Sequence, residues 1–409
     1  MLEDSRSWDN PRLSGVHWEE LAERFGTPLY VYDAAVIGRQ FRRLSEAFGE
    51  VPCDIKFAMK ALPTLGILRL MRSLGAGIDA VSLNEVKLAL HAGFEADDIL
   101  FTPSSAPFGE IEEAHALGVQ LNLGELATIE RFAERFGSAA SCCVRIRPDI
   151  RDGGHAAIQV GHAGSKFGVP SAELSRVREL VAANKLRVNG LHVHTGSDIQ
   201  DPETFLRSAE LLFTYARDFG ALEFLDFGGG FKVAYRPDQQ AADIDRIGAR
   251  FSEAYSSFAT ETGLAPRVWL EPGKYLVSES GTLLVRVTVV NRSGGRTFVG
   301  VDSGLNHLIR PMMYGAYHHI ANISNPSGPR SRYTVVGYIC ETDTFGEDRE
   351  LADVRQGDLL AIANAGAYGY SMSSNYNARM RPAEVLVADG SAELIRERES
   401  FDDLIRHQR

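Results

Sequence analysis

Residues 191–216, LHVHTGSDIQDPETFLRSAELLFTYA, contain one complete unit of a pattern that recurs along the chain. The unit opens with a short apolar strand at 191–194. Asp201 then suits the N-cap of a helix, and Pro202 suits its first helical position. Apolar residues follow at the three- and four-residue spacing of a buried helical face, at Phe205, Ala209, Leu212, Phe213 and Ala216.

Short apolar runs of this kind alternate with amphipathic segments over more than half of the sequence. Together they give eight candidate strands, at 55–59, 77–81, 99–102, 119–122, 142–146, 191–194, 224–227 and 268–271. Eight strand–helix repeats predict an α/β fold with a closed parallel (β/α)8 barrel of the TIM type, whose functional residues lie at the C-terminal strand ends. An open doubly wound sheet shows the same alternation, and repetition alone does not establish closure.

The rhythm changes after Pro272. Five β-prone runs follow with few helical stretches between them, at 283–290, 297–301, 333–339, 359–363 and 383–387. We therefore expect the barrel to span residues 29–274 and a mainly β domain to span residues 275–409. Residues 1–28 precede the first barrel unit, and we expect them to pack on the β domain.

Composition narrows the class of protein. The 409 residues are 44% hydrophobic and 24% charged, which is close to the average for globular proteins. No apolar run is long enough to span a membrane, and the first residues lack the pattern of a secretory signal. The net charge of -11 repels nucleic acid, and four cysteines fit no disulfide framework. We expect a cytoplasmic protein that binds neither nucleic acid nor a membrane.

Several polar residues fall at predicted strand ends, where a barrel would bring them together: Lys60, Asp79, His194, Gly228, Gly229, Gly230 and Glu271. A lone lysine at a strand end is commonly a solvated surface charge. Lys60, however, lies between the apolar stretches 57–59 and 61–63. Apolar surroundings disfavour the charged form, which is what an imine-forming lysine requires.

The other strand ends allow functional and structural interpretations side by side. The glycines 228–230 follow the seventh strand, where barrels bind phosphate through backbone N–H groups, although they could form a flexible turn. Glu271 begins the sequence EPGK. A carboxylate there could keep a pyridine nitrogen protonated, or could cap a turn at the barrel end.

A metal-dependent hydrolase is the main rival from another class. His192 and His194 are two residues apart on a predicted strand, so both point to one face, as in metal-binding H-x-H pairs. The other strand ends supply no further histidines. We therefore expect no bound metal.

The motifs at these positions resemble those of a known family. FAMKA at 57–61, HVHTGS at 192–197, DFGGG at 226–230 and EPG at 271–273 are similar to the alanine-racemase-like decarboxylases that use pyridoxal phosphate. The C-terminal half resembles the diaminopimelate decarboxylases within that group. Its matching motifs are VDSGLNHLIRPMMY at 301–314, CET at 340–342, NAGAYG at 364–369 and SSNYN at 373–377.

This resemblance implies a role for each matching residue. Lys60 would carry pyridoxal phosphate as an imine, His194 would stack on the cofactor ring, and Glu271 would pair with the pyridine nitrogen. Cys340 would return a proton to the substrate carbon after carbon dioxide leaves. The remaining cofactor-binding set would comprise Asp79, Ser197, Gly228, Gly229, Gly230, Gly273, Lys274 and Tyr368.

The resemblance also implies a substrate and an assembly. Meso-2,6-diaminopimelate carries a distal ammonium and a distal carboxylate. Arg310 and Tyr314 would hold the carboxylate, with Lys274 and Tyr368 nearby, and Glu341 would take the ammonium. Arginine suits this task because its planar fork binds a carboxylate at two points. The active site would lie between two subunits, so a homodimer is expected. The alternatives are decarboxylation of ornithine, lysine or arginine, or an amino-acid racemase.

Two positions depart from the family pattern. The family has arginine where this chain has Lys274, and lysine keeps the charge but not the two-point grip. After Cys340 the family has an acidic residue four positions on, whereas this chain has Thr344 there, preceded by Asp343. The family pattern pairs that acidic residue with Lys166 across the subunit interface.

Overall fold

The structure is a computed structural model that describes residue 10, residues 12–147 and residues 166–409. The chain folds into two compact units. The barrel unit comprises the described parts of residues 39–233 together with residues 240–276. The β unit comprises the described part of residues 1–38 together with residues 234–239 and 277–409.

The barrel unit contains the eight strands that the sequence predicts. They are β4 (Cys53–Ala58), β5 (Gly77–Ala80), β6 (Ile99–Phe101), β7 (Gln120–Leu123), β8 (Ser141–Arg147), β10 (Arg187–Val193), β11 (Phe224–Asp226) and β12 (Arg267–Leu270). Each pairs in parallel with its neighbours, and the pairing of β10 with both β8 and β11 closes the ring. The closed barrel is confirmed, and the open doubly wound sheet is excluded. A short strand, β9 (Val169–Pro170), pairs with β8.

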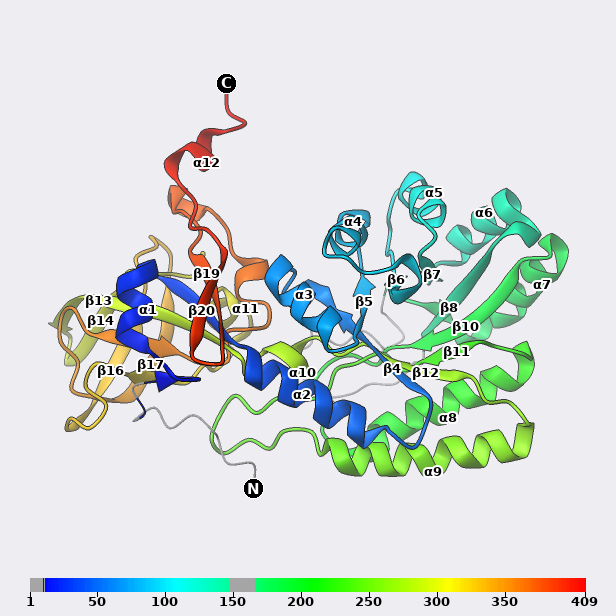
Figure 1. Ribbon diagram of the computed structural model, residues 1–409, viewed down its shortest axis with the longest axis horizontal. Helices are drawn as coiled ribbons and strands as arrows, with labels where there is room; N and C mark the ends of the chain where they lie inside the picture. Colours follow the sequence, from blue (N-terminus) through cyan, green and yellow to red (C-terminus); the bar gives the residue numbers. More distant parts are fainter. Residues whose placement is uncertain (1–9, 11, 148–165) are drawn as a thin grey trace. The chain divides into compact units, whose positions relative to one another are not determined.

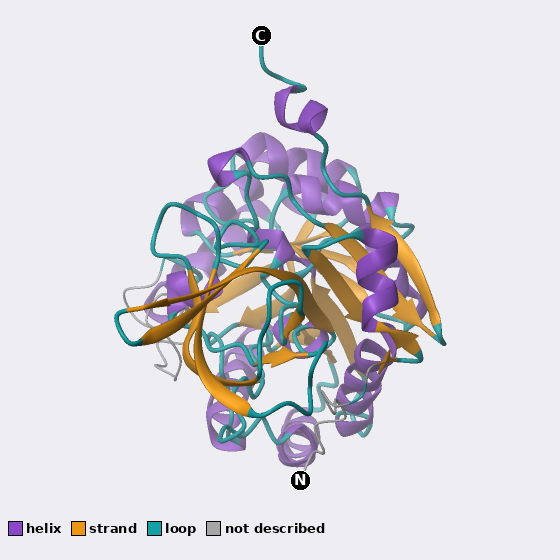
Figure 2. Ribbon diagram, turned by 90° about the vertical axis from the view of Figure 1, so that its left-hand side faces the viewer, coloured by secondary structure: helices purple, strands orange, loops and turns teal. Residues whose placement is uncertain are grey.

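Helices lie outside this ring of strands (Figures 1 and 2). They are α3 (Leu65–Ser73), α4 (Leu83–His91), α5 (Phe108–Ala116), α6 (Leu126–Phe136), α7 (Leu174–Asn184), α8 (Pro202–Phe219) and α9 (Ile244–Thr262), together with the end of α2 (Ala34–Ala47). Helix α8 starts as predicted, since the Asp201 side chain accepts a hydrogen bond from the Thr204 backbone N–H at 3.0 Å. Phe213 of α8 stacks on Phe258 of α9, with ring centroids 4.6 Å apart. No described helix is long and apolar enough to cross a bilayer.

The β unit is built on a mostly antiparallel sheet with strand order β17-β16-β14-β13-β3-β19-β20. These strands are β3 (Leu29–Asp33), β13 (Gly281–Ser293), β14 (Arg296–Val301), β16 (Arg330–Val336), β17 (Thr344–Ala352), β19 (Ala383–Ala388) and β20 (Ser391–Arg396). Two further strands, β15 (Ile320–Asn322) and β18 (Leu359–Ile362), join it through β13. The five predicted β-prone runs all contain strands, so the mainly β domain after the barrel is confirmed.

One strand differs from the expected division of the chain. β3 lies inside the range 29–274 that we expected for the barrel, but it pairs with β13 and β19 in the β unit. The sequence of β3, LYVYD, is buried throughout and has the same character as a barrel strand. Its partners β13 and β19 lie about 250 and about 350 residues later in the chain. A local sequence pattern therefore could not show which sheet β3 joins.

The shorter elements complete the described structure. At the start of the chain β1 (Arg12–Leu13) pairs with β2 (Val16–His17), followed by α1 (Trp18–Phe25). Side chains from this segment, including Trp18 and Leu21, join the apolar core formed with β3, β13, β18 and β19. Helix α10 (Lys274–Val277) follows β12, and α11 (Arg310–Tyr314) and α12 (Phe401–Ile405) lie in the β unit.

Replacing Gly248 by alanine tests the packing of α9 on the end of α2. A Cβ atom at Gly248 would collide with the backbone carbonyl oxygen of Ala47. We expect Gly248→Ala to lower the melting temperature, with the roughly 1–3 kcal/mol cost typical of overpacking. Gly109→Ala, in helix α5, is the matched control, because a Cβ atom at Gly109 would meet no other atom within 4 Å. It should leave the melting temperature unchanged or raise it; equal losses in both variants would contradict the packing.

Candidate active site

Lys60 and Asp79 meet at the C-terminal ends of neighbouring strands. Ala58 of β4 is paired in register with Asp79 of β5, and Lys60 follows two residues later in the turn Met59–Ala61. The Lys60 Nζ lies 2.9 Å from Asp79 Oδ2, and the two side chains are 41% and 1% exposed. The expected apolar surroundings of Lys60 are therefore wrong. A buried carboxylate holds its ammonium group instead.

The three glycines after β11 form a cradle lined by backbone. Gly228 and Gly230 have φ angles of 65° and 95°, in the left-handed region that favours glycine. A Cβ on Gly230 would collide with the carbonyl oxygen of Gly196, and one on Gly229 with that of Glu271. Within the described chain, the buried Ser197 Oγ beside this cradle has no hydrogen-bond partner.

His194 adjoins the same cradle. Its Nδ1 accepts a hydrogen bond from the Gly229 backbone N–H at 3.2 Å, which leaves Nε2 as the protonated ring nitrogen. Burial and the nearby positive charge of Arg145 lower the pKa of His194 to about 3. The imidazole is therefore neutral near pH 7, and a neutral ring can pack flat against another aromatic ring without a desolvated charge.

Glu271 lies just after β12 in a buried polar cluster. Its Oε2 is 3.3 Å from Nε2 of His192, whose ring is fully buried. The other ring nitrogen of His192 lies 2.6 Å from Nδ2 of Asn122, and that same amide nitrogen donates to Thr102 Oγ1 at 3.1 Å. A chain of buried hydrogen bonds thus connects Glu271 to the interior of the barrel.

Asp226, the last residue of β11, is the second carboxylate of this cluster. It is fully buried, it pairs in register with His192, and its Oδ1 accepts a hydrogen bond from the Gly228 backbone N–H at 2.8 Å. Burial and the charge of Glu271 raise the pKa of Asp226 well above its usual range. Burial also raises the pKa of Glu271, but the charge of His192 and a hydrogen bond from it outweigh that effect, so the net shift is downward.

These features fit pyridoxal phosphate. The Gly228 and Gly229 N–H groups already donate to Asp226 and His194, so the Gly230 N–H and the unpartnered Ser197 hydroxyl are the donors that the cradle offers to a phosphate. Glu271 Oε1 is buried and has no partner among the described residues. It offers an ionised acceptor for a pyridinium N–H. The neutral His194 ring and the Lys60 amine complete the set of groups that such a cofactor needs.

Gly273 and Lys274 follow Glu271 directly. A Cβ on Gly273 would lie 3.0 Å from the carbonyl oxygen of Ala58, so the glycine lets this turn pack closely on the end of β4. The Lys274 Nζ is paired with Asp198 Oδ1, and its side chain is only 11% exposed. Asp198 is not among the residues that the sequence predicts for the site. Its carboxylate balances much of the charge that we expected Lys274 to offer to phosphate or substrate.

The remaining predicted site residues, Arg310, Tyr314, Cys340, Glu341 and Tyr368, belong to the β unit. Arg310 and Tyr314 are four residues apart on α11 and so share a helix face. The Arg310 guanidinium lies 5.0 Å from the ring centroid of Tyr235, and Nη1 donates to the carbonyl oxygen of Ala367 at 3.4 Å. Tyr368 follows with a φ angle of 57°, a constrained backbone conformation for a non-glycine residue.

Cys340 and Glu341 form a separate exposed cluster with two residues of the 373–377 motif. Cys340 Sγ lies 3.2 Å from Asn377 Nδ2 and 3.9 Å from the Tyr376 hydroxyl. That hydroxyl donates to Glu341 Oε1 at 2.9 Å. In the sequence this motif contributes only to the family resemblance, whereas the structure shows that Tyr376 and Asn377 contact Cys340.

Asp343 holds a turn of its own chain. It is buried, Oδ1 accepts a hydrogen bond from the Leu305 N–H at 2.7 Å, and Oδ2 accepts one from the Ile339 N–H at 2.9 Å. Both oxygens therefore hold the turn that precedes β17. Lys166 lies over the ring of Phe167, 5.0 Å from its centroid.

The proposed H-x-H metal pair does not converge. The rings of His192 and His194 are 6.4 Å apart, His192 faces Glu271, and His194 Nδ1 is bound to a backbone N–H. The tighter group is His192 with Asp226 and Glu271, whose polar atoms lie within 4.8 Å of one another.

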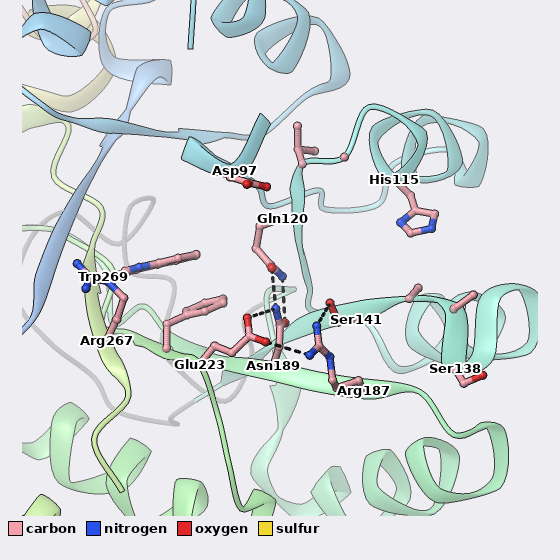
Figure 3. Close-up of a pocket in the computed structure, with 15 residues that line it drawn as sticks. Asp97, His115, Gln120, Ser138, Ser141, Arg187, Asn189, Glu223, Arg267 and Trp269 are labelled. Atoms are coloured by element: carbon pink, nitrogen blue, oxygen red, sulfur yellow. Dashed lines mark hydrogen bonds and ion pairs between the residues drawn. The ribbon is translucent and has the colours of Figure 1, made fainter. Parts of the chain in front are cut away.

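A cavity of about 600 Å³ opens at the opposite end of the barrel, among residues that begin the strands (Figure 3). Its polar side chains are largely paired with one another. The guanidinium of Arg187 lies 3.1 Å from the Glu223 carboxylate, and the amides of Gln120 and Asn189 exchange hydrogen bonds of 2.8 and 3.2 Å. Residues at this end of a barrel generally serve stability, so we place the candidate site at the mouth.

Comparison with known proteins supports this choice of site. Residues 34–278 match the family model of the pyridoxal-binding domain of pyridoxal-dependent decarboxylases. The class of protein is therefore a decarboxylase that uses pyridoxal phosphate.

Full-length relatives narrow the class. The diaminopimelate decarboxylase of Methanothermobacter thermautotrophicus is 40% identical, with 97% of this chain and 95% of the relative covered. The crystal structure of the Helicobacter pylori enzyme complexed with L-lysine is 34% identical, with a TM-score of 0.87 over 95% of this chain and 98% of that one. A lysine/ornithine decarboxylase from Vibrio vulnificus is 25% identical, with a TM-score of 0.78 over 91% and 97%. The chain belongs to the diaminopimelate decarboxylase family.

Replacing Gly230 by alanine tests the cradle. The new Cβ would collide with the Gly196 carbonyl oxygen and displace the turn. We expect the dissociation constant for pyridoxal phosphate, measured by absorbance titration, to rise about tenfold or more. Gly220→Ala is the matched control, because Gly220 also has a positive φ of 79° but a Cβ there meets nothing within 4 Å. Unchanged cofactor affinity in Gly230→Ala would rule out the cradle as the phosphate site.

Proposed function

We propose that this protein decarboxylates meso-2,6-diaminopimelate to L-lysine and carbon dioxide, the last step of lysine biosynthesis. The observation that carries the proposal is that three features meet at one mouth of the barrel. Lys60 is paired with Asp79, the glycine cradle lies beside a Ser197 hydroxyl without a partner among the described residues, and Glu271 is ionised. The full-length similarity to diaminopimelate decarboxylases supports the choice of substrate. The solved diaminopimelate decarboxylases from Helicobacter pylori and from M. jannaschii, both complexed with L-lysine, are consistent with lysine as the product.

When bound, pyridoxal phosphate supplies an electron sink for the electron pair that departing carbon dioxide leaves on the substrate carbon. The residues of this chain bind and orient the reactants. Lys60 would bind the cofactor covalently, and Asp79 holds the ammonium of Lys60 in place. His194 would pack on the ring face, while Glu271 would accept a hydrogen bond from the pyridine nitrogen and so keep it protonated.

Ser197 and the glycine turn Gly228, Gly229 and Gly230, through the Gly230 N–H, would hold the phosphate of the cofactor. Gly273, Lys274 and the Tyr368 hydroxyl would lie nearby. The pairing of Lys274 with Asp198 supports a positioning role for this lysine rather than an independent charge on the substrate. More of the substrate carboxylate recognition then falls to Arg310.

Charge recognition favours diaminopimelate over simpler basic amino acids. Arg310 and Tyr314 hold the distal carboxylate, and Glu341 takes the distal ammonium. The Arg310 Nε is buried without a partner among the described residues, so part of its fork is available to a carboxylate. Ornithine and lysine have no distal carboxylate to offset the cost of leaving this group unpaired.

The proton-returning residue and the assembly are part of the same proposal. Cys340 returns a proton to the substrate carbon after decarboxylation. Cys340, Glu341 and Tyr376 are all exposed in a single chain, which supports their use in a homodimer whose active sites are shared between subunits. The absence of disulfides among the described cysteines is consistent with a cytoplasmic location.

A substrate panel tests the function. Carbon dioxide release should be seen with meso-diaminopimelate and be at least about a hundredfold slower with lysine, ornithine or arginine, a difference of ~2.7 kcal/mol in transition-state binding. Lys60→Ala should abolish both the release and the visible absorbance of the bound cofactor. Turnover of ornithine without turnover of diaminopimelate would sink the proposal.

Arg310→Gln tests the distal carboxylate site. We expect kcat/KM for diaminopimelate to fall about a hundredfold, because a charged two-point contact is lost, while the cofactor absorbance stays unchanged. Arg332→Gln, an exposed residue on β16, is the matched control and should behave as the unmodified protein does. Equal kinetics for Arg310→Gln and the control would remove Arg310 from the substrate site.

A further inference from the structure

We propose that Asp226 is a positioning residue for the reaction: carrying a proton, it donates a hydrogen bond to Glu271 and, with His192, fixes the Glu271 carboxylate in its ionised form. The inference rests on the proposed function only in taking Glu271 as the partner of the cofactor's pyridine nitrogen. The protonation of Asp226 is a property of the protein itself and can be measured without any turnover.

Asp226 and Glu271 each have one buried carboxylate oxygen without a hydrogen-bond partner among the described residues. Asp226 Oδ1 is fixed by the Gly228 N–H, but its Oδ2 is buried and has no partner among the described residues. Glu271 Oε1 is in the same condition. The two carboxylates lie within one buried group whose polar atoms are no more than 4.8 Å apart. A single proton between these oxygens provides each with a partner.

Electrostatics then decides how many protons the pair holds. Two ionised carboxylates at this separation, both out of water, repel each other strongly, so one of them keeps a proton. Catalytic carboxylate pairs of other enzymes likewise share one proton, because two neighbouring negative charges repel each other.

The neighbouring charges decide which acid keeps the proton. His192 and Lys60 favour an ionised Glu271, and the His192 Nε2 lies 3.3 Å from Glu271 Oε2. Among the described residues Asp226 has no basic side chain in an ion pair of this kind. Arg145, the carboxylate of Asp79 and the buried Cys143 thiol act on both acids. Lys56, whose ammonium donates to the carbonyl oxygen of Asp98, and the Cys53 thiol act on Asp226. The proton therefore belongs on Asp226, and the charge on Glu271.

In this arrangement the aspartate of the DFGGG motif, Asp226, contacts both the glycine cradle and Glu271. Asp226 holds the first N–H of the glycine cradle with one oxygen and Glu271 with the other. The same residue thus links the phosphate end of the site to the pyridine end. His192, held in turn by Asn122, contacts the second oxygen of Glu271. Each oxygen of the Glu271 carboxylate then has one donor before any ligand binds, and Oε1 keeps a second lone pair for the pyridinium N–H. A carboxylate held in this way is preorganised, as a charge-stabilising group needs to be.

A pair of substitutions tests the proton and the role together. Asp226→Asn keeps the acceptor for Gly228 and a neutral donor toward Glu271, whereas Asp226→Ala removes both. With reconstituted full-length protein, we expect Asp226→Ala to lose at least about tenfold in kcat with a smaller change in KM, and Asp226→Asn to recover most of that loss. The cofactor absorbance, a readout besides activity, should change with pH in the alanine variant and match the unmodified protein in the asparagine variant.

The pH dependence of stability gives a second readout. Because the folded protein holds a proton that the unfolded chain releases above about pH 4, the unmodified protein loses stability as pH rises toward the folded pKa of Asp226. Asp226→Asn lacks this loss. The melting temperature of the variant, relative to that of the unmodified protein, should therefore rise as the pH is raised from about 5 to about 8. Asp54→Asn is the control of opposite sign. Burial raises the pKa of Asp54, but its bonds to Arg267 outweigh this and lower it, so the Asp54 variant should not gain with pH.

An infrared spectrum of the same protein completes the test. The carbonyl stretch of a protonated carboxyl group should be present near neutral pH and be missing from Asp226→Asn. The proposal is overturned if that band is absent, if Asp226→Asn fails to gain stability with pH, or if it loses as much activity as Asp226→Ala. Failure of diaminopimelate turnover in the unmodified protein would instead count against the proposed function. The infrared and melting measurements would still decide whether Asp226 is protonated, because they do not depend on turnover.

Discussion

The pairing of β10 with both β8 and β11 is the constraint on which the site depends. It closes the sheet, and closure brings to one mouth the ends of strands that lie more than 200 residues apart in sequence, from Lys60 to Glu271. The parallel register then sets the finer geometry. Ala58 opposite Asp79 brings Lys60 to its carboxylate, and His192 opposite Asp226 builds the buried acid cluster.

The mouth combines groups that would be costly in isolation. A buried carboxylate is stable only when charges and hydrogen bonds compensate for lost water. Asp79 is compensated by Lys60, and Glu271 by His192. Asp226 is instead held neutral. The cluster thereby keeps one negative charge fixed at Glu271, where a pyridinium nitrogen requires it, and a neutral His194 where a ring face requires no charge.

Much of this organisation is predictable from sequence, and the exceptions have physical causes. The eight barrel strands follow from local apolar runs, and the start of α8 from Asp201 and Pro202. β3 was placed wrongly because its partners lie far along the chain. β17 and β20 were missed because charged residues such as Glu347 and Glu393 interrupt their apolar pattern. The partners of Lys60 and Lys274 depend on strand register and on a loop conformation, neither of which a single sequence displays.

The same limit explains why Asp226 was passed over as a strand residue. Its importance comes from two orphaned oxygens that meet only after folding. Likewise the residues 376 and 377 were part of a quoted motif, but their contact with Cys340 required the turn that Asp343 holds together.

The central claim is that Lys60 at this barrel mouth carries pyridoxal phosphate. Borohydride reduction of the purified protein, followed by proteolysis and mass spectrometry, tests it directly. The account predicts that the visible absorbance of the imine disappears and that the phosphopyridoxyl mass is found on the peptide containing Lys60. Labelling of a different lysine, or no label on protein saturated with cofactor, would contradict the account.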